Sequence, residues 1–503
     1  MPRAHITHVG FLSLLLAACH GVTANSKPET FDFVIAGGGT AGLVVANRLS
    51  ELRGVSIAVV EPGPDARDSP EVQSLDFNFA VYNKSINWVY TTPPQPELGS
   101  RIFEYRAGKA LGGTSAVNGM VYIRGDKAQY DAWETLGNKG WNWDSVFFSA
   151  KRGESFTPPS KAQVASGASY DRTAHGNSGP LDIGFPHTFT NSSYHDKASS
   201  AFKTVGLQSI SDLNGGNMHG FVVAPWTVDR DAGVREDSAR AYYTPVEARG
   251  KVKIIRGTVK RIIWARSRGK DAVADGVEYI DPSGKVIKLG AKREVILSAS
   301  AYRSPLILEG SGIGNPKILQ SLSIPTKIPL PGVGESLQDH PALSMTYALS
   351  PTAPITGRTP FAALPNIHDV FPNPATLATS TLAQLQEWAG AVSSHTNSAI
   401  PPEAVLTRFR VQHDLVLSEK VYATEPLKGL VEGSVNGMHV IGSCAMLPRE
   451  LGGVVDARAK VYGTRNVRVV DASIIPMQLS GHTMAPVYAV AERAAGLIKA
   501  DWE

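Results

Sequence analysis

The 503-residue sequence has little cysteine, little excess charge and, after its first residues, no long apolar run. Of its two cysteines, Cys19 belongs to a segment expected to be removed, which leaves Cys444. A disulfide framework and a cysteine-based metal site are thus excluded, and no metal is predicted. The 49 basic and 45 acidic residues give a net charge of only +4, without a run of Lys or Arg. Nucleic acid is therefore not expected as a partner.

One apolar run lies at the N-terminus. It extends from Val9 to Ala18, follows Arg3 and leads to Val22-Thr23-Ala24, a small-x-small cleavage pattern. This arrangement is typical of a secretory signal peptide, so we expect residues 1–24 to be removed and the protein to be secreted or to enter the secretory pathway. Because the run has only half of the ~20 residues that a spanning helix needs, stable membrane insertion is not expected.

Two other interpretations of the N-terminus stay open at this point. A short membrane anchor is one, and a bacterial lipoprotein is the other, since Leu16-Ala17-Ala18 precedes Cys19. Two N-x-S triplets, at Asn83 and Asn191, favour the secretory route in a eukaryote. They predict a glycoprotein, although such triplets also arise by chance.

The order of predicted elements indicates an α/β protein. A strand at 31–36, a helix at 43–52 and a strand at 55–60 open the mature chain, and a strand at 467–470 with a helix at 487–500 closes it. The intervening sequence predicts strands at 252–255, 259–264, 274–280, 286–289 and 294–299, helices from Pro305 and at 380–394 and 402–418, and loops at 62–105 and 351–377.

A glycine motif lies between the first strand and the first helix. Gly37, Gly39 and Gly42 have the G-x-G-x-x-G spacing, and Glu61 follows Gly42 by 19 residues at the end of the next strand. Such glycines allow a tight turn and bring backbone N–H groups close to a pyrophosphate, while the acid binds a ribose hydroxyl. The motif indicates FAD or NAD, and the alternative is a structural glycine turn with a surface glutamate.

Two further segments carry a family resemblance. Residues 108–119, continuing to Gly125, and residues 300–314 resemble the two signatures of the glucose-methanol-choline (GMC) flavoprotein oxidoreductases, and residues 332–341 and 438–500 are also similar. The resemblance implies FAD as cofactor and a Rossmann-like FAD-binding domain interleaved with a smaller α+β substrate domain. It assigns 31–150, 230–340 and 439–503 to the FAD-binding domain and 151–229 and 341–438 to the substrate domain.

The resemblance also implies which residues contact FAD. Beside the first motif, with Thr40 and Ala41, the second glycine cluster would lie against the flavin and the pyrophosphate. The remaining implied contacts come from several parts of the chain: Trp88, Gly112, Gly113, Thr114, Asn118, Gly119, Met120, Val121, Val259, Asp471, Ala472, Thr483 and Met484. For Trp88 and Val259, packing in the core is an alternative to a cofactor contact.

The catalytic prediction concerns two histidines. Alcohol oxidation by a flavin needs a hydride acceptor, N5, and a base for the hydroxyl proton, and imidazole has a suitable pKa near neutrality. His439 and His482 lie 43 residues apart, each in a loop before regular structure. By the resemblance, His439 is the base and His482 the partner that positions the alkoxide. Cys444 is interpreted as a small core residue rather than a nucleophile.

The predicted function is oxidation of a hydroxyl group, with O2 or another compound as electron acceptor. An aromatic or polyketide-derived alcohol of fungal secondary metabolism is the expected substrate class. Only 99 positions separate His340 from His439, which is short for this family and predicts an abbreviated substrate domain. Two alternatives stay open: a flavin-containing lyase or cyclase without net redox chemistry, and an FAD-binding remnant with impaired catalysis.

Overall fold

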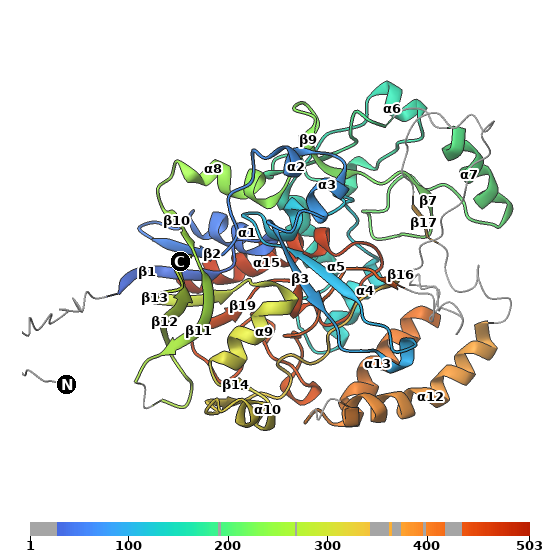
Figure 1. Cartoon of the computed structure of the whole chain (residues 1–503). Coiled ribbons are helices and arrows are strands. Elements are labelled where there is room, and N and C mark those ends of the chain that lie inside the picture. The colour runs from blue at the N-terminus through green and yellow to red at the C-terminus, as the bar shows by residue number, and fades with distance from the viewer. Residues whose placement is uncertain are drawn as a thin grey trace, which may run out of the picture.

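The computed structural model describes residues 28–503 apart from 190–192, 267–268, 343–361, 365–373, 396–398 and 418–434. The predicted signal peptide and Asn191 therefore lie outside the described residues. So does most of the predicted loop at 351–377, although its described parts include a short strand, β17 (Ala362–Leu364), and the start of a helix, α12 (Pro374–His395). Figure 1 shows the arrangement of the elements.

A seven-stranded sheet forms the centre of the fold and confirms the predicted α/β class. The strand order β10-β2-β1-β13-β12-β11, with β19 beside β13, joins parallel strands on one side to an antiparallel pair on the other. The bounds are β1 Glu29–Ala36, β2 Ile57–Glu61, β10 Val252–Arg256, β11 Thr258–Trp264, β12 Ala274–Ile280, β13 Val286–Leu297 and β19 Val467–Val469. All come from segments predicted for the FAD-binding domain, whose boundaries stay a prediction.

Helices cover this sheet because its parallel strands are apolar on both faces. Every residue of β2 is buried, and α1 (Thr40–Leu49) packs against α15 (Met484–Trp502) and lies beside β2. The helix α15 in turn packs on α5 (Trp143–Gly153), so the C-terminal helix lies between elements from the first third of the chain. In Figure 1 the red C-terminal helix runs through this blue and cyan region.

A smaller sheet lies beside the main one. It has the order β5-β6-β8-β9, and β7 pairs with β17, β14 with β15, and β16 with β18. The bounds are β5 Glu154–Phe156, β6 Leu181–Gly184, β7 Gly220–Val222, β8 Trp226–Asp229, β9 Val234–Arg235, β14 Ile313–Gly314, β15 Ile328–Pro329, β16 Pro341–Ala342 and β18 Val435–Asn436. The pair β16 and β18 joins segments almost a hundred residues apart, directly beside two histidines of the site below.

The remaining helices lie mostly around the edges. In Figure 1, α12 and α13 (Pro402–Leu417) lie on the side away from the main sheet, where Ala389, Ala404 and Val405 form a small core of their own. The others are α2 Pro70–Gln73, α3 Phe77–Val81, α4 Lys127–Thr135, α6 Lys161–Ala165, α7 Ser193–Thr204, α8 Thr244–Glu247, α9 Ser300–Gly310 and α10 Pro316–Ser321. Within the described parts, no helix combines the length and the apolarity that crossing a bilayer requires.

Three sequence predictions of local structure were wrong. Residues 62–105 are not a simple loop, because they contain α2, α3 and the hairpin of β3 (Asn87–Thr91) and β4 (Glu104–Gly108). The two strands predicted at 286–289 and 294–299 are one strand, β13, which pairs with β12 along its first part and with β1 and β19 further on. Pairing on both sides keeps this strand extended through Gly290.

The third difference is the start of α9, at Ser300 instead of Pro305. Pro305 lies inside the helix, where a proline removes the hydrogen bond to the carbonyl four residues earlier. That carbonyl belongs to Ala301, and the Ser443 hydroxyl donates to it at 2.6 Å. A residue from the C-terminal part of the chain thus replaces the missing bond, which the local sequence could not reveal.

Candidate active site

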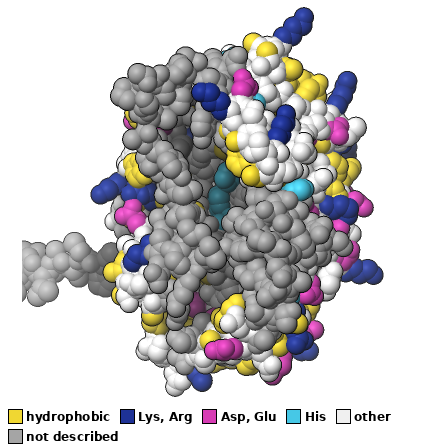
Figure 2. Space-filling view, turned by 90° about the vertical axis from the view of Figure 1, so that its right-hand side faces the viewer, with side chains coloured by type: hydrophobic (Ala, Val, Ile, Leu, Met, Phe, Trp, Pro, Cys, Tyr) yellow, Lys and Arg dark blue, Asp and Glu magenta, His cyan; other side chains and the backbone are white. Residues whose placement is uncertain are grey.

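A cavity of about 350 Å3 lies where the parallel strands end. Ala36, Glu61 and Ser298 line it from the carboxyl ends of β1, β2 and β13, the edge at which open α/β sheets bind ligands. The β3–β4 hairpin and two C-terminal loops form other walls. On the face that Figure 2 shows, histidine side chains lie within a hollow.

Most of the residues predicted from the sequence line this one cavity. They come from segments far apart in the chain: Gly37, Gly39, Thr40, Ala41, Glu61, Trp88, Gly113, Thr114, Asn118, Gly119, Met120, Val121, Val259, His439, Asp471, Ala472, His482, Thr483 and Met484. The fold therefore brings the predicted cofactor residues and both predicted catalytic histidines together. Their individual roles stay a prediction.

Gly42 and Gly112 do not line the cavity, and their contact with a cofactor stays a prediction. A Cβ at Gly42 would lie 2.0 Å from the Gly37 carbonyl oxygen, so this glycine lets the helix pack against the turn before it. Gly112 has φ +95°, and a Cβ there would lie 2.9 Å from a carboxylate oxygen of Asp237. Both positions need glycine for packing within the protein.

The N-terminus of α1 opens into the cavity without a side-chain cap. Its N-cap residue is Gly39, and the first turn carries no acidic residue. The backbone N–H groups at such an end have no partner within the helix and carry partial positive charge. A phosphate would find hydrogen-bond donors there.

The Glu61 carboxylate closes the turn beside this helix. It accepts from the Gly38 N–H at 2.9 Å and from the Gly63 N–H at 2.7 Å. Burial raises the pKa of Glu61 to about 7, and the two backbone donors oppose that rise. A ribose hydroxyl that donated to the remaining lone pairs would favour the ionised carboxylate.

Asp471 joins the C-terminal strand to α9. Its carboxylate accepts from the Ser300 N–H at 2.9 Å and from the Ser304 hydroxyl at 2.5 Å, and it also binds the backbone of Ser473. Ser300 has φ +75°, a left-handed conformation that non-glycine residues seldom adopt. The carboxylate therefore holds this turn at the cavity wall, in addition to any contact with a ligand.

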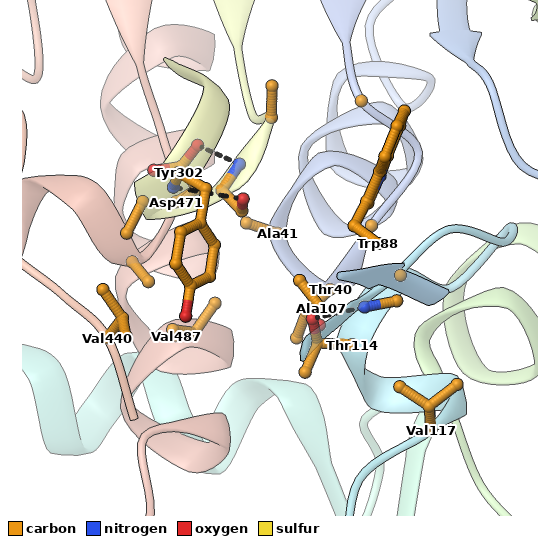
Figure 3. Close-up of a pocket in the computed structure, with 18 of the residues that line it drawn as sticks. Thr40, Ala41, Trp88, Ala107, Thr114, Val117, Tyr302, Val440, Asp471 and Val487 are labelled. Atoms are coloured by element: carbon orange, nitrogen blue, oxygen red, sulfur yellow. Dashed lines mark hydrogen bonds between the residues drawn. The ribbon is translucent and has the colours of Figure 1, made fainter. Parts of the chain in front are cut away.

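Two aromatic side chains, Trp88 and Tyr302, line the cavity. Tyr302 stacks on Tyr90 with ring centroids 4.5 Å apart. Trp88 lies between two cations, with the Arg303 guanidinium 4.4 Å and the Lys109 amine 4.6 Å from its ring centroid. Figure 3 shows Tyr302 pointing into the cavity toward Val440 and Val487. The Tyr302 hydroxyl is buried and has no hydrogen-bond partner within the described residues, so it is available to a ligand.

Three histidines from three segments meet beside the cavity, which His439 and His482 line. The rings of His439 and His482 have centroids 4.9 Å apart. The Nδ1 atoms of His439 and His340 lie 2.9 Å apart, and Nε2 of His340 lies 2.8 Å from the Leu479 carbonyl oxygen. Asp339 supports the same loops, because its carboxylate accepts from the backbone N–H groups of His340, Met438 and His439.

The histidines are held in a neutral state. Burial lowers the pKa of His439 to about 3 and that of His482 to about 4, from an ordinary value of 6.5, and neighbouring histidines add to the effect. Burial also lowers the pKa of His340. At pH 7 each ring keeps a lone pair that can accept a proton.

Sequence comparison now places the chain in a family. Two models, each described as GMC oxidoreductase, match residues 31–342 and 381–491. The chain belongs to the GMC oxidoreductase family. Its relatives include the glucose oxidase-like protein fsoC of Humicola fuscoatra, which is 38% identical over 97% of this chain and 99% of that protein. Pyranose dehydrogenase 3 of Leucoagaricus meleagris is 30% identical over 98% of each chain.

Solved structures agree with this membership. An FAD-dependent oxidoreductase from Chaetomium thermophilum superposes with a TM-score of 0.81 at 26% identity, covering 94% of this chain and 99% of that one. The GMC protein described here is accordingly an FAD-dependent oxidoreductase that acts on hydroxyl donors. The alignment with fsoC has 584 positions, more than the 503 residues of this chain, so the relative carries residues that this chain lacks.

The cavity fits FAD. The uncapped start of α1 offers donors to a pyrophosphate, and Glu61 offers an acceptor to the adenosine ribose. Gly39 lines the cavity and leaves room there for a ligand. A Cβ at this position would meet nothing closer than the Gly113 Cα at 3.6 Å and would occupy part of that space. Cys444 is free and completely buried, in agreement with a core position.

Sequence reasoning did not assign roles to Asp339, His340 or Tyr302. Asp339 and His340 lie in the segment 332–341, and Tyr302 lies in the second signature, so all three belong to segments that resemble the family. The run Gln338-Asp339-His340 is polar and precedes a proline, which is the one local signal that it bears function. Only the fold shows that this run contacts the loop of His439, 99 residues later.

Proposed function

We propose that this GMC oxidoreductase oxidises an alcohol with His439 as the proton acceptor. The observation that carries the proposal is the pair of neutral imidazoles, His439 and His482, in the wall of the cavity that also holds the α1 N-terminus and Glu61. FAD, when bound, supplies the acceptor for the hydride that leaves the alcohol carbon. The protein must then bind the alcohol, remove its hydroxyl proton and exclude water.

His439 is suited to proton removal through Nε2. Its Nδ1 is engaged with His340, so Nε2 is the ring nitrogen left to face the hydroxyl of a substrate. The base is held in place by its backbone, because Asp339 binds the His439 N–H at 2.7 Å and Gln478 donates to the His439 carbonyl at 3.0 Å. A fixed base within reach of the hydroxyl lowers the entropic cost of proton transfer.

His482 completes the binding of the hydroxyl oxygen. Its Nδ1 is buried and has no hydrogen-bond partner within the described residues. A hydrogen bond between His482 and the substrate oxygen would orient the alcohol toward His439 and stabilise the developing alkoxide. The adjacent Thr483 and Met484 line the cavity at the start of α15 and would hold the flavin with Asn118 and Met120.

The substrate we propose is an aromatic or polyketide-derived alcohol of fungal secondary metabolism. The cavity around the histidines presents Val121, Met438 and Val440 together with the ring of Tyr302. These apolar and aromatic side chains suit a flat apolar substrate, whereas a sugar would need several polar partners. The electron acceptor that reoxidises the protein is O2 or another small molecule.

We also propose that the protein follows the secretory route. The basis is the N-terminal pattern of residues 1–24, with Asn83 as a candidate glycosylation site in the described part of the chain. Protein sequencing of the N-terminus of material from the culture medium tests this. Removal of about 24 residues is expected from the length of such leaders, and a chain that starts at Met1 in the cytosol would refute it.

An anaerobic spectroscopic assay tests the reaction itself. The purified protein should be yellow, and alcohols from a panel of aromatic, aliphatic and sugar compounds are added without O2. Bleaching of the oxidised flavin band with formation of aldehyde or ketone supports the proposal. Product without bleaching would instead show a lyase or cyclase, and neither signal with any alcohol would show a flavin-binding remnant.

A further inference from the structure

His340 and the Leu479 carbonyl form a chain of hydrogen bonds that ends at His439. Nε2 of His340 lies 2.8 Å from the Leu479 carbonyl oxygen, and Nδ1 of His340 lies 2.9 Å from Nδ1 of His439. The two imidazole planes are nearly perpendicular, at 85°. Leu479 itself precedes Ser480-Gly481-His482, so the loop that carries the second catalytic histidine also anchors His340.

The Leu479 carbonyl determines which nitrogens carry the protons in this series of hydrogen bonds. A carbonyl oxygen only accepts hydrogen bonds, so Nε2 of His340 must carry its proton. The Nδ1 atom of a neutral His340 is then an acceptor, and the Nδ1 atom of His439 must be the donor. The opposite arrangement would place the unprotonated Nε2 of His340 against the carbonyl, two acceptors 2.8 Å apart in a buried site, which is costly.

We infer that His340 is a positioning residue that holds His439 in the tautomer with its proton on Nδ1 and its lone pair on Nε2. The inference rests on the proposed role of His439 as proton acceptor. Without an acceptor at Nδ1, His439 can place its proton on Nε2 instead, and a ring in that state cannot accept the hydroxyl proton there.

The groups that face His439 are consistent with neutral His340 and His439 rings. His340 and His482 contact it from two sides, and Asp339 binds its backbone and also the Tyr105 hydroxyl. Burial lowers the pKa of His340, which favours the neutral ring whose Nδ1 accepts a hydrogen bond. The carboxylate of Asp339 accepts from three backbone N–H groups and competes for neither imidazole.

Two variants of His340 distinguish the effect of its hydrogen-bond acceptor, Nδ1, from the effects of the rest of the side chain. In His340→Asn, the side-chain oxygen can occupy the place of Nδ1 and still accept from His439. In His340→Leu, no acceptor remains. Both variants remove the donor to Leu479, so any loss caused by that contact is common to both, and only the acceptor to His439 differs.

Tautomers are measured first, by 15N spectra of the holoprotein labelled at histidine, with a His439→Gln sample to identify the His439 signals. We expect an Nδ1-protonated His439 in the wild type and in His340→Asn, and a shift toward the Nε2-protonated form in His340→Leu. A wild-type His439 protonated on Nε2, or an unchanged tautomer in His340→Leu, would overturn the inference. This readout does not depend on activity, so it stays decisive even if the proposed reaction is wrong.

Kinetics of flavin reduction provide the second measurement. We expect His340→Leu to lower the reduction rate about 10-fold or more, less than the ~10²–10⁴-fold contribution of a general base because His439 itself remains, with little change in KM. His340→Asn should recover most of that rate. Equal losses in the two variants, or a loss in KM alone, would show that His340 acts only by packing or by binding the substrate. If the wild type reduced no flavin while the tautomers behaved as expected, the proposed function would fail and the positioning role would stand.

Discussion

The carboxylate of Asp339 accepts a hydrogen bond from the backbone N–H of His439 at 2.7 Å, across 100 residues of sequence. The same carboxylate binds the N–H of Met438, which has φ +57°, a left-handed conformation that costs free energy for a non-glycine residue. Asp339 thus holds the loop of the proposed base in the conformation seen in the structure.

Replacement of Asp339 by asparagine should weaken the site without a change in side-chain size. The amide NH2 group would face the Met438 N–H, so this solvent-exposed donor would lose its carboxylate acceptor, at a cost of about 1 kcal/mol. We expect a lower midpoint of thermal unfolding and slower flavin reduction. Asp231→Asn is the matched control, because its side chain is 96% exposed. Equal behaviour of the two variants would show that Asp339 does not organise the loop.

The two histidines of the site should behave as one unit. We expect His439→Ala to lower the rate of flavin reduction by about 10²-fold or more, while bound FAD remains, because it removes the proton acceptor. His482→Ala should also slow reduction, and the double variant should cost less than the summed free-energy effects, since both residues act on one oxygen.

Stopped-flow absorbance under anaerobic conditions measures these rates. His187→Ala is the control, because His187 is an exposed histidine outside the cavity. A His439→Ala protein whose flavin is reduced at the wild-type rate would show that the base is another group. If His439→Ala lost FAD and stability together, His439 would be a packing residue.

Two glycines of the first motif should respond differently to alanine. At Gly39 the new methyl group meets only ordinary contact with the protein and projects into the cavity, so Gly39→Ala should weaken FAD binding while the apoprotein stays folded. At Gly42 it would lie 2.0 Å from the Gly37 carbonyl oxygen, so Gly42→Ala should destabilise the apoprotein itself. Thermal unfolding of both apoproteins and FAD titration by fluorescence distinguish the cases, and a destabilised Gly39→Ala apoprotein would contradict the assignment.

Glu61→Ala should impair FAD retention. The variant leaves the ribose hydroxyls without an acceptor and also frees the N–H groups of Gly38 and Gly63. Each lost hydrogen bond to a charged group costs about 1.5–3 kcal/mol, so we expect at least a 10-fold weaker FAD affinity. Glu247→Ala is the control, because that side chain is 51% exposed. Unchanged flavin content in Glu61→Ala after dialysis would refute the ribose contact.

The buried histidines should make stability depend on pH. The pKa of His482 falls from 6.5 to about 4 on folding, so between these values the unfolded chain binds a proton that the folded protein does not. The free energy of unfolding should therefore fall as the pH is lowered from about 7 to about 4, by up to ~1.4 kcal/mol per pH unit for one group. Glu61 acts in the opposite direction, because its pKa is raised to about 7.

A comparison with His482→Asn isolates this effect. The variant carries no titratable group at position 482, so it should gain stability relative to the wild type as the pH falls from 7 to 5. Urea unfolding of the two apoproteins at several pH values measures the difference. Parallel curves would mean that the pKa of His482 does not change on folding, against the lowered pKa that its burial causes.

Local patterns in the sequence were enough to predict several features of the site. The motif from Gly37 to Gly42 lies between an apolar strand and a helix, and Glu61 ends the next strand, so both could be placed at the ligand-binding edge of a parallel sheet. The pair His439 and His482 was also accessible, since each lies in a loop of a segment that resembles the family. These predictions depend on residues within short stretches of chain.

Contacts between residues far apart in the sequence could not be predicted from these patterns. His340 contacts His439, which lies 99 residues later in the sequence. The Ser443 hydroxyl donates to the Ala301 carbonyl, which lacks its helical donor because of Pro305. The Tyr302 hydroxyl points into the cavity. The glycines of one motif also divide into different roles, because packing around Gly42 and open space beside Gly39 arise from neighbours that the motif does not contain. These hydrogen bonds and this burial depend on chain segments that folding brings together, so they cannot be predicted from a short stretch of sequence.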